Sequence, residues 1–268
     1  MGRPRRQSAD YGRSLPRRPR RERTLCVSRS ARPRRDPGVS SHRVEVAIFA
    51  IAFAIFGLVA FALVWSGDWA YAALANVNGV KGTTFTSKLL TTTSVEWSVD
   101  LPALVEWHRR WTAYVIGLRE PPAGLGTFSG AEYEHMADVR NVFRGAEVAA
   151  LLALGVGAFR LRRARRDGDA LRLVRDGGLL AAALVVAAGI GAVFAFDQLF
   201  LLFHEVFFPQ GNFLFDPATS NLLRLYPEWY WQGVTAGVAV SFIAAALLAA
   251  VGAHLALRRA STKYTPAA

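Results

Sequence analysis

Residues 44–66 have the sequence VEVAIFAIAFAIFGLVAFALVWS, an apolar run with a single charged side chain near its start. At 1.5 Å per helical residue, a run of this length spans the hydrocarbon core of a bilayer, which is about 30 Å thick. Three further runs of Ala, Leu, Val, Ile, Phe and Gly occupy 143–161, 178–201 and 233–257. The sequence therefore predicts a mainly α membrane protein with four transmembrane helices.

Basic residues indicate which connections face the cytoplasm. The segment 160–176, RLRRARRDGDALRLVRD, carries seven arginines, and Arg258, Arg259 and Lys263 follow the fourth run. By the positive-inside rule these segments and both termini are cytoplasmic, so the loops 67–142 and 202–232 face outward. All seven tryptophans fall in or beside these two loops, where interfacial aromatic belts form.

Residues 1–43 differ in composition from the rest of the chain. They hold 14 of the 32 basic residues that give the chain its formal charge of +12, and they show no apolar periodicity. We expect a disordered Arg-rich cytoplasmic tail, followed by a four-helix membrane domain over 44–268. Because the tail leads directly into an apolar run, anionic lipid headgroups explain its arginines more economically than nucleic acid does. Cys26 is the single cysteine, which excludes disulfides within one chain.

The first outer loop carries local structure signals. Val95, Trp97 and Val99 alternate with polar residues, which predicts a strand paired with the Thr-rich stretch before it. Asp100 and Pro102 mark a helix start. The apolar stripe that follows fits a helix on the membrane surface and, equally, a helix packed on an outer domain; it comprises Leu104, Trp107, Trp111, Val115 and Leu118. The outer loops are therefore expected to form a small extracytoplasmic α+β portion.

A second helix is expected to begin outside the membrane. Ser129 and Glu132 form a capping box, after which a helical pattern continues into the second apolar run. His135 and Asp138 lie three residues apart near its start, so they share a face and the carboxylate is in position to orient the imidazole.

The third apolar run ends in FDQLFLLFHEVFF, in which Asp197 and His204 lie seven residues apart on one helical face. His204 is 29 residues from Arg175, and His135 is 25 residues from Arg160. For straight helices these separations are about 43 Å and about 37 Å. The two imidazoles are thus expected at nearly the same level, just outside the hydrocarbon.

Several common catalytic motifs are absent from the sequence. His204 and Glu205 begin HEVFF, but Phe208 stands where a zinc protease has its second histidine. The sequence has no GxSxG elbow, no phosphate loop and no glycine fingerprint for dinucleotides. We therefore expect no cofactor and no bound metal, and general acid-base catalysis by histidine is the chemistry that these residues can supply.

Two segments resemble those of a known family. They are FSGAEYEHMADVRNVF at 128–143 and FHEVFFPQGNFLFDPATSNLLRLYPEWYW at 203–231, which are similar to motifs of the bacterial lipoprotein intramolecular transacylase (Lit) family of four-span membrane proteins. The resemblance extends over about 44–257. It implies an inner-membrane enzyme that moves an acyl chain from the diacylglyceryl group of a lipoprotein's N-terminal cysteine to the α-amine of that cysteine.

The resemblance also implies roles for individual residues. His135 and His204 correspond to the family's functional histidines, with Asp138, Arg140 and Asp216 in support; Asp197 and Glu205 are further carboxylates near His204. Membrane lipids and diacylated lipoproteins are the expected partners, while the oligomeric state, the acyl chain and the identity of the base stay open. Two alternatives also stay open: a non-catalytic accessory protein that binds a partner, and a metal-dependent membrane hydrolase.

Overall fold

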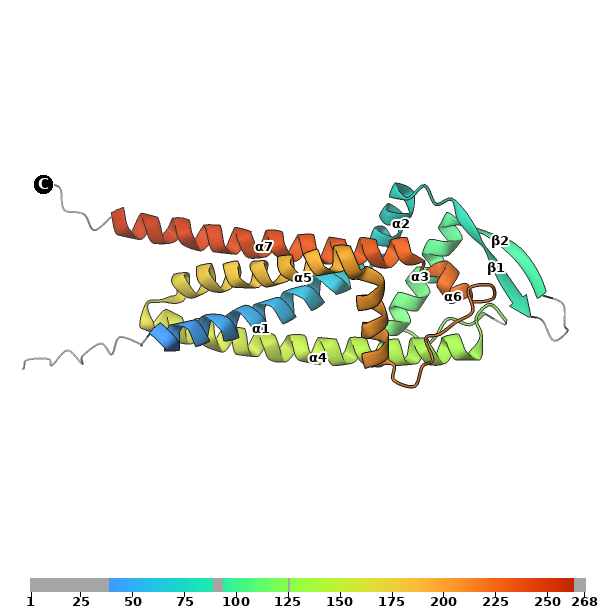
Figure 1. Ribbon diagram of the computed structural model, residues 1–268, viewed down its shortest axis with the longest axis horizontal. Coiled ribbons are helices and arrows are strands. Elements are labelled where there is room, and N and C mark those ends of the chain that lie inside the picture. Colours follow the sequence, from blue (N-terminus) through green and yellow to red (C-terminus); the bar gives the residue numbers. More distant parts are fainter. Residues whose placement is uncertain (1–38, 89–93, 125, 263–268) are drawn as a thin grey trace, which may run out of the picture. The chain divides into compact units, whose positions relative to one another are not determined.

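The computed structural model describes residues 39–88, 94–124 and 126–262, all within one unit, Pro37–Ala268. Four of its helices are long and apolar enough to cross a membrane: α1 (Val39–Trp65), α4 (Gly130–Asp167), α5 (Ala170–Phe207) and α7 (Glu228–Thr262) (Figure 1). The predicted fold class is confirmed. Residues 1–38 of the predicted tail lie outside the described residues, and 39–43 already belong to α1.

The Arg-rich segment 160–176 is helical rather than a loop. Helix α4 continues to Asp167 and α5 begins at Ala170, so only two residues connect them. Arginine is a good helix former, and the helix ends where Gly168 adopts a left-handed conformation with a φ of 82°.

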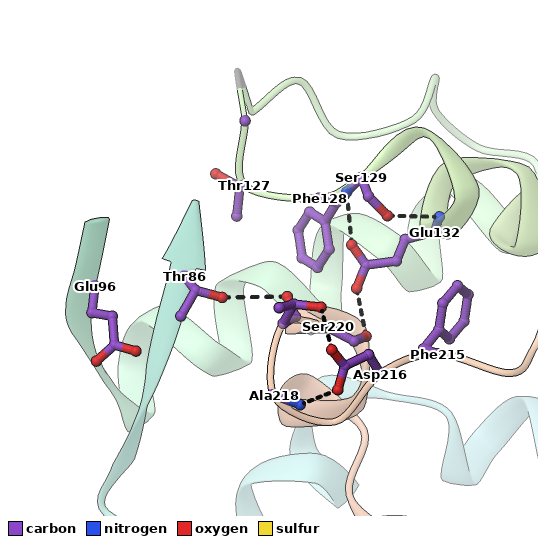
Figure 2. Close-up of a pocket in the computed structure, with 12 residues that line it drawn as sticks. Thr86, Glu96, Thr127, Phe128, Ser129, Glu132, Phe215, Asp216, Ala218 and Ser220 are labelled. Atoms are coloured by element: carbon purple, nitrogen blue, oxygen red, sulfur yellow. Dashed lines mark hydrogen bonds between the residues drawn. The ribbon is translucent and has the colours of Figure 1, made fainter. Parts of the chain in front are cut away.

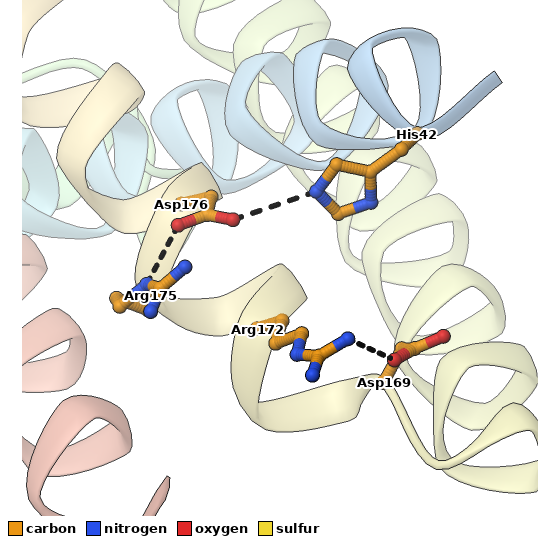
Figure 3. A network of polar contacts seen from close by, with 5 residues as sticks. All are labelled: His42, Asp169, Arg172, Arg175 and Asp176. Atoms are coloured by element: carbon orange, nitrogen blue, oxygen red, sulfur yellow. Dashed lines mark hydrogen bonds and ion pairs between the residues drawn. The ribbon is translucent and has the colours of Figure 1, made fainter. Parts of the chain in front are cut away.

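Polar contacts join this end of α4 and α5 to the start of α1. Arg160 Nη1 lies 2.8 Å from a carboxylate oxygen of Glu45, and His42 Nε2 lies 3.4 Å from Asp176. Asp176 also pairs with its neighbour Arg175 at 2.7 Å (Figure 3). These pairs connect three helices at the end that carries most of the positive charge.

The membrane helices pack through small side chains. Ala50 of α1, Ala181 of α5 and Ala246 of α7 are fully buried in one cluster. A Cβ added at Gly178 would lie 3.0 Å from the carbonyl oxygen of Ala246, so α5 and α7 approach closely there. Close backbone approach of this kind is the usual basis of helix association in lipid.

The two loops that the sequence predicts to face outward fold into a small domain, which we name the outer domain after that prediction. It contains α2 (Asp68–Val77), β1 (Gly82–Lys88), β2 (Ser94–Asp100), α3 (Leu101–Val115) and α6 (Asn221–Leu225). The two strands pair antiparallel with Phe85 opposite Trp97, as the alternating pattern predicts. Asp100 caps α3 by accepting a hydrogen bond from the Ala103 N–H at 3.0 Å, so the predicted helix start is also confirmed.

Aromatic side chains fill the core of this domain. Tyr71, Phe85 and Trp111 are fully buried together. Leu104 and Val115, from the apolar stripe of α3, are buried in the same cluster. The stripe of α3 therefore packs on the outer domain.

A buried carboxylate ties the start of α4 to α6. The predicted capping box is present: Glu132 Oε2 accepts from the Ser129 N–H at 2.7 Å, and the Ser129 hydroxyl accepts from the Glu132 N–H. Glu132 Oε1 accepts from the Ser220 hydroxyl at 2.6 Å (Figure 2). The same oxygen accepts from the Leu222 N–H at 2.7 Å. Since Ser220 caps α6, one side chain holds two helix starts in register.

Candidate active site

His135 and His204 lie side by side between α4 and α5. Their rings are nearly parallel, with an interplanar angle of 14° and ring centroids 6.1 Å apart. The His135 side chain is buried, whereas His204 is half-buried. Two imidazoles at this separation can serve one bound substrate.

A kink in α5 makes this meeting possible. The backbone at Ala195 is non-helical, with φ −141° and ψ 37°, and the residues after it run across the bundle toward α4 (Figure 1). Gly189 and Gly191 lie within two turns before the kink and weaken the helix there. The expected straight helix of about 43 Å is therefore wrong: only about 30 Å of helix separates Arg175 from Ala195. His204 reaches the level of His135 because the chain turns sideways.

Phenylalanine rings surround the pair. Phe208 and Phe215 lie 4.7 and 5.5 Å from the His135 ring, and Phe200 and Phe213 lie 4.3 and 5.2 Å from the His204 ring, measured between centroids. In such apolar surroundings electrostatic interactions are stronger than in water. Two imidazolium ions 6.1 Å apart would repel by about 3 kcal/mol at an effective dielectric constant of about 20, so the pair disfavours a second proton.

The hydrogen bonds of the two rings differ. His204 Nδ1 lies 2.7 Å from the carbonyl oxygen of Phe200. A carbonyl only accepts, so Nδ1 carries the hydrogen and the lone pair of the neutral ring is on Nε2. Among the described residues, His135 Nδ1 is buried and has no hydrogen-bond partner.

Asp138 holds the loop after α5 rather than the imidazole of His135. Its Oδ2 accepts from Gln210 Nε2 at 2.7 Å and from Asn212 Nδ2 at 2.6 Å. Neither amide stands out in the sequence as a candidate site residue. Because Asn212 donates to Asp138 through nitrogen, its Oδ1 is left as an acceptor and is turned toward the His135 imidazole, although no hydrogen bond of good geometry forms. The site thus contains two buried polar atoms without a well-formed hydrogen bond, His135 Nδ1 and Asn212 Oδ1.

The other expected supporting residues do not contact the pair. The Arg140 guanidinium stacks over the Tyr114 ring at 4.8 Å, and five helical residues place Arg140 about 140° around α4 from His135. Asp216 folds its own turn, where its Oδ1 accepts from the Ala218 N–H at 2.9 Å. Asp197 and Glu205 are exposed, and neither forms a hydrogen bond or ion pair with a described residue.

Comparison with known families identifies the family of the chain. A profile of the lipoprotein intramolecular transacylase Lit family matches residues 43–231, which include both histidines. The chain belongs to the Lit family. A comparison with curated proteins gave no match.

Solved structures of a Lit protein have the same fold as this chain. The in meso structure of the membrane-integral lipoprotein intramolecular transacylase Lit from Bacillus cereus matches with a TM-score of 0.63 and 14% identity, covering 82% of this chain and 98% of that chain. Two variants of that protein, with one histidine replaced by arginine or by alanine, each match with a TM-score of 0.60 and 15% identity. They cover 83% and 82% of this chain and 94% and 96% of their own.

Metal binding at this Lit-family site would need a set of side-chain ligands gathered in one place. Within 39–88, 94–124 and 126–262, no three His, Cys, Asp or Glu side chains gather as a set of metal ligands. The two histidines are instead surrounded by aromatic rings and amides. The alternative of a metal-dependent hydrolase therefore has no ligand set in this part of the chain.

Proposed function

We propose that this Lit-family protein is a lipoprotein intramolecular acyltransferase that works at the outer leaflet of a bacterial inner membrane. It transfers an acyl chain from the diacylglyceryl group of a lipoprotein to the α-amine of the N-terminal cysteine. The observation that carries this proposal is the stacked His135–His204 pair, enclosed by phenylalanines, in a chain of this family.

The reaction needs two proton movements. The amine nitrogen forms a bond to the ester carbonyl carbon and loses a proton, and the glyceryl oxygen leaves with its electron pair and gains a proton. An α-ammonium group has a pKa near 8, so a base that works near neutral pH is suited to it. Conversion of an ester into an amide is downhill and needs no nucleotide or other co-reactant.

We assign the base to His204. Its Nδ1–H donates to the carbonyl of Phe200, which leaves Nε2 free to accept the amine proton and stabilises the imidazolium that forms. His135 then supplies the proton to the leaving oxygen. The pair carries one proton before and after the transfer, in agreement with the repulsion between two charged rings at this distance.

The unpaired amide oxygen of Asn212 suits the substrate amine. An amine donates hydrogen bonds, and Asn212 Oδ1 is a buried acceptor oriented by the bond from Nδ2 to Asp138. The backbone N–H groups of Asn212 and Phe213 donate to no described backbone or side-chain acceptor and are suited to the developing oxyanion, a role for which Arg140 is too far around its helix.

A location of the active site at the outer leaflet agrees with the charge distribution along α4 and with the exposed surface of α5. About 37 Å of helix separates His135 from the Arg-rich end of α4 that begins at Arg160. After the kink, α5 exposes apolar side chains, with Leu202 52% and Val206 62% exposed. Such a surface lies favourably against acyl chains at the membrane interface.

The test is production of the protein in a bacterium that lacks its own N-acylating step, followed by mass spectrometry of lipoprotein N-termini. We expect one acyl chain on nitrogen and one on the glyceryl group, which gives the same total number of chains as in the substrate. A free amine with both chains still on glycerol would contradict the proposal and favour a non-catalytic accessory protein.

Orientation has a separate test. Cys26 is the single native cysteine, so a membrane-impermeant thiol reagent should label it only after cells are permeabilised. A Glu96→Cys, Cys26→Ser variant should be labelled in intact cells. The reverse pattern would place the outer domain in the cytoplasm.

A further inference from the structure

A polar cleft lies on the outer domain beside the histidine pair. It has a volume of about 390 Å³ and lies between the β1–β2 ribbon and the turn that precedes α6. Thr86 and Glu96 line it from the ribbon, while Glu132 and Phe215 line the opposite side (Figure 2). Of the residues described at the site above, only Phe215 and Asp216 belong to its lining, and neither histidine does.

Hydrogen bonds fix the walls of the cleft. The Asn221 side chain pairs with both backbone groups of Thr86, at 2.9 Å and 2.7 Å, as a neighbouring strand would. The Thr86 hydroxyl donates to the carbonyl of Thr219, and Glu132 joins α4 to α6. The opening is therefore built into the domain, and closing it would break buried hydrogen bonds.

The cleft is continuous with the catalytic pair. Phe215 lines the cleft and also packs edge-on against His135, with centroids 5.5 Å apart. Glu132 lies one helical turn before His135, on the side of the pair away from the membrane bundle. The Phe215 ring therefore lies between His135 and the cleft, so the cleft is the neighbouring opening for a chain that leaves the histidines on this side.

The geometry of the substrate dictates what must follow this route. The amine that reacts belongs to a cysteine whose acyl chains lie in the membrane and whose polypeptide continues in the opposite direction. The lining favours a main chain with neutral or basic side chains, because it contains the carboxylates of Glu96, Glu132 and Asp216 and no described Lys or Arg. Glu96 is exposed and forms no hydrogen bond with a described residue.

We propose that this cleft binds the peptide segment that directly follows the acylated cysteine of the lipoprotein. The proposal rests on the proposed acyltransferase function. The outer domain would then bind the first residues of the substrate and prefer basic over acidic side chains.

The test uses the purified full-length protein in detergent with three synthetic diacylated substrates. The first is a cysteine amide without further residues, and the other two carry five residues with either lysine or glutamate at the third position. Glu96→Arg should raise KM for the lysine peptide about tenfold and reverse the preference between the peptides. The kcat values, and all values for the cysteine amide, should not change.

The control is Ser98→Arg, which places the same side chain two residues along β2 on the same exposed face but outside the cleft; it removes no carboxylate, so it isolates the effect of the added arginine. It should behave as the unmodified protein. Equal effects of Glu96→Arg on all three substrates, or on none, would overturn the cleft proposal. If the unmodified protein converts no substrate at all, the acyltransferase function itself fails, which is a distinguishable result.

Discussion

Two buried histidines of this protein have opposite surroundings. His108, 1% exposed, is fully partnered: Nε2 donates to the carbonyl of Ser66 at 3.1 Å, which leaves Nδ1 to accept from the Tyr226 hydroxyl at 3.3 Å. His135, 7% exposed, leaves Nδ1 without a partner among the described residues and faces a second imidazole. Burial alone therefore does not mark a functional histidine. His135 is distinguished by an unpaired nitrogen on a ring that faces a second imidazole, because the desolvation cost of that nitrogen is not offset by the protein itself.

The largest effect is expected when the imidazole ring of either site histidine is removed. His135→Ala and His204→Ala should each lower the rate of acyl transfer by about 100-fold to 10,000-fold, the usual contribution of general acid-base catalysis. The thermal midpoint in detergent should change far less than the rate, because His135 Nδ1 makes no well-formed hydrogen bond with a described residue and the single side-chain bond of His204 is to the carbonyl of Phe200 within its own helix. The measurement is mass spectrometry of lipopeptide products over time. Activity that persists in either variant would remove that histidine from the mechanism.

The sequence was sufficient for much of this arrangement, since apolar runs, a capping box and strand alternation are local patterns. It was not sufficient for the kink at Ala195, because no proline marks it and the helical pattern continues on both sides. Nor did it reveal why the histidines meet, since the depth comparison assumed a straight α5.

The two amide side chains of the site were also not predicted from the sequence. Asn212 and Gln210 lie in a loop without periodicity, and their contacts with Asp138 join positions more than seventy residues apart in sequence. The spacing of His135 and Asp138 placed the carboxylate on the same helical face as the imidazole. It could not show that the side chains of Gln210 and Asn212 donate hydrogen bonds to that carboxylate. Cues of this kind exist only in three dimensions.

A second prediction tests the role of the Asn212 amide oxygen. Asn212→Ala removes the proposed acceptor for the substrate amine and should lower kcat/KM by about 10-fold to 100-fold, the range for a hydrogen bond to a charged group. Gln210→Ala is the matched control, because it removes one donor to the same Asp138 oxygen but no unpaired atom. Equal losses in the two variants would mean that Asn212 acts only by holding the loop.

A third prediction concerns His108, whose effect should fall on stability alone. Burial lowers the pKa of His108 to about 4, from an ordinary value near 6.5. Because the unfolded chain binds the proton more readily, the stabilising effect of the neutral ring is complete above pH 6.5 and is lost as pH falls toward 4. Between pH 7.5 and 5.5 this loss is about 1 kcal/mol.

The measurement is the thermal midpoint in detergent at these two pH values. His108→Gln carries no titrating ring, so its midpoint should fall less than that of the unmodified protein over the same interval. Acyl transfer at pH 7.5 should continue in the folded variant. An identical pH dependence in both proteins would show that other groups control it.

The smallest effect is expected at the opposite end of the bundle, where His42 pairs with Asp176 (Figure 3). The His42 and Asp176 side chains are 42% and 29% exposed, and such pairs contribute about 0–1 kcal/mol. His42→Ala leaves Asp176 paired with Arg175, so no charge loses its partner. We expect less than a twofold change in the rate of acyl transfer and a stability change below about 1 kcal/mol, measured by the same product assay and thermal midpoint. A large loss of activity would mean that the outer site depends on contacts at the other end of α5, and exposure and partnering would then no longer separate structural from functional histidines.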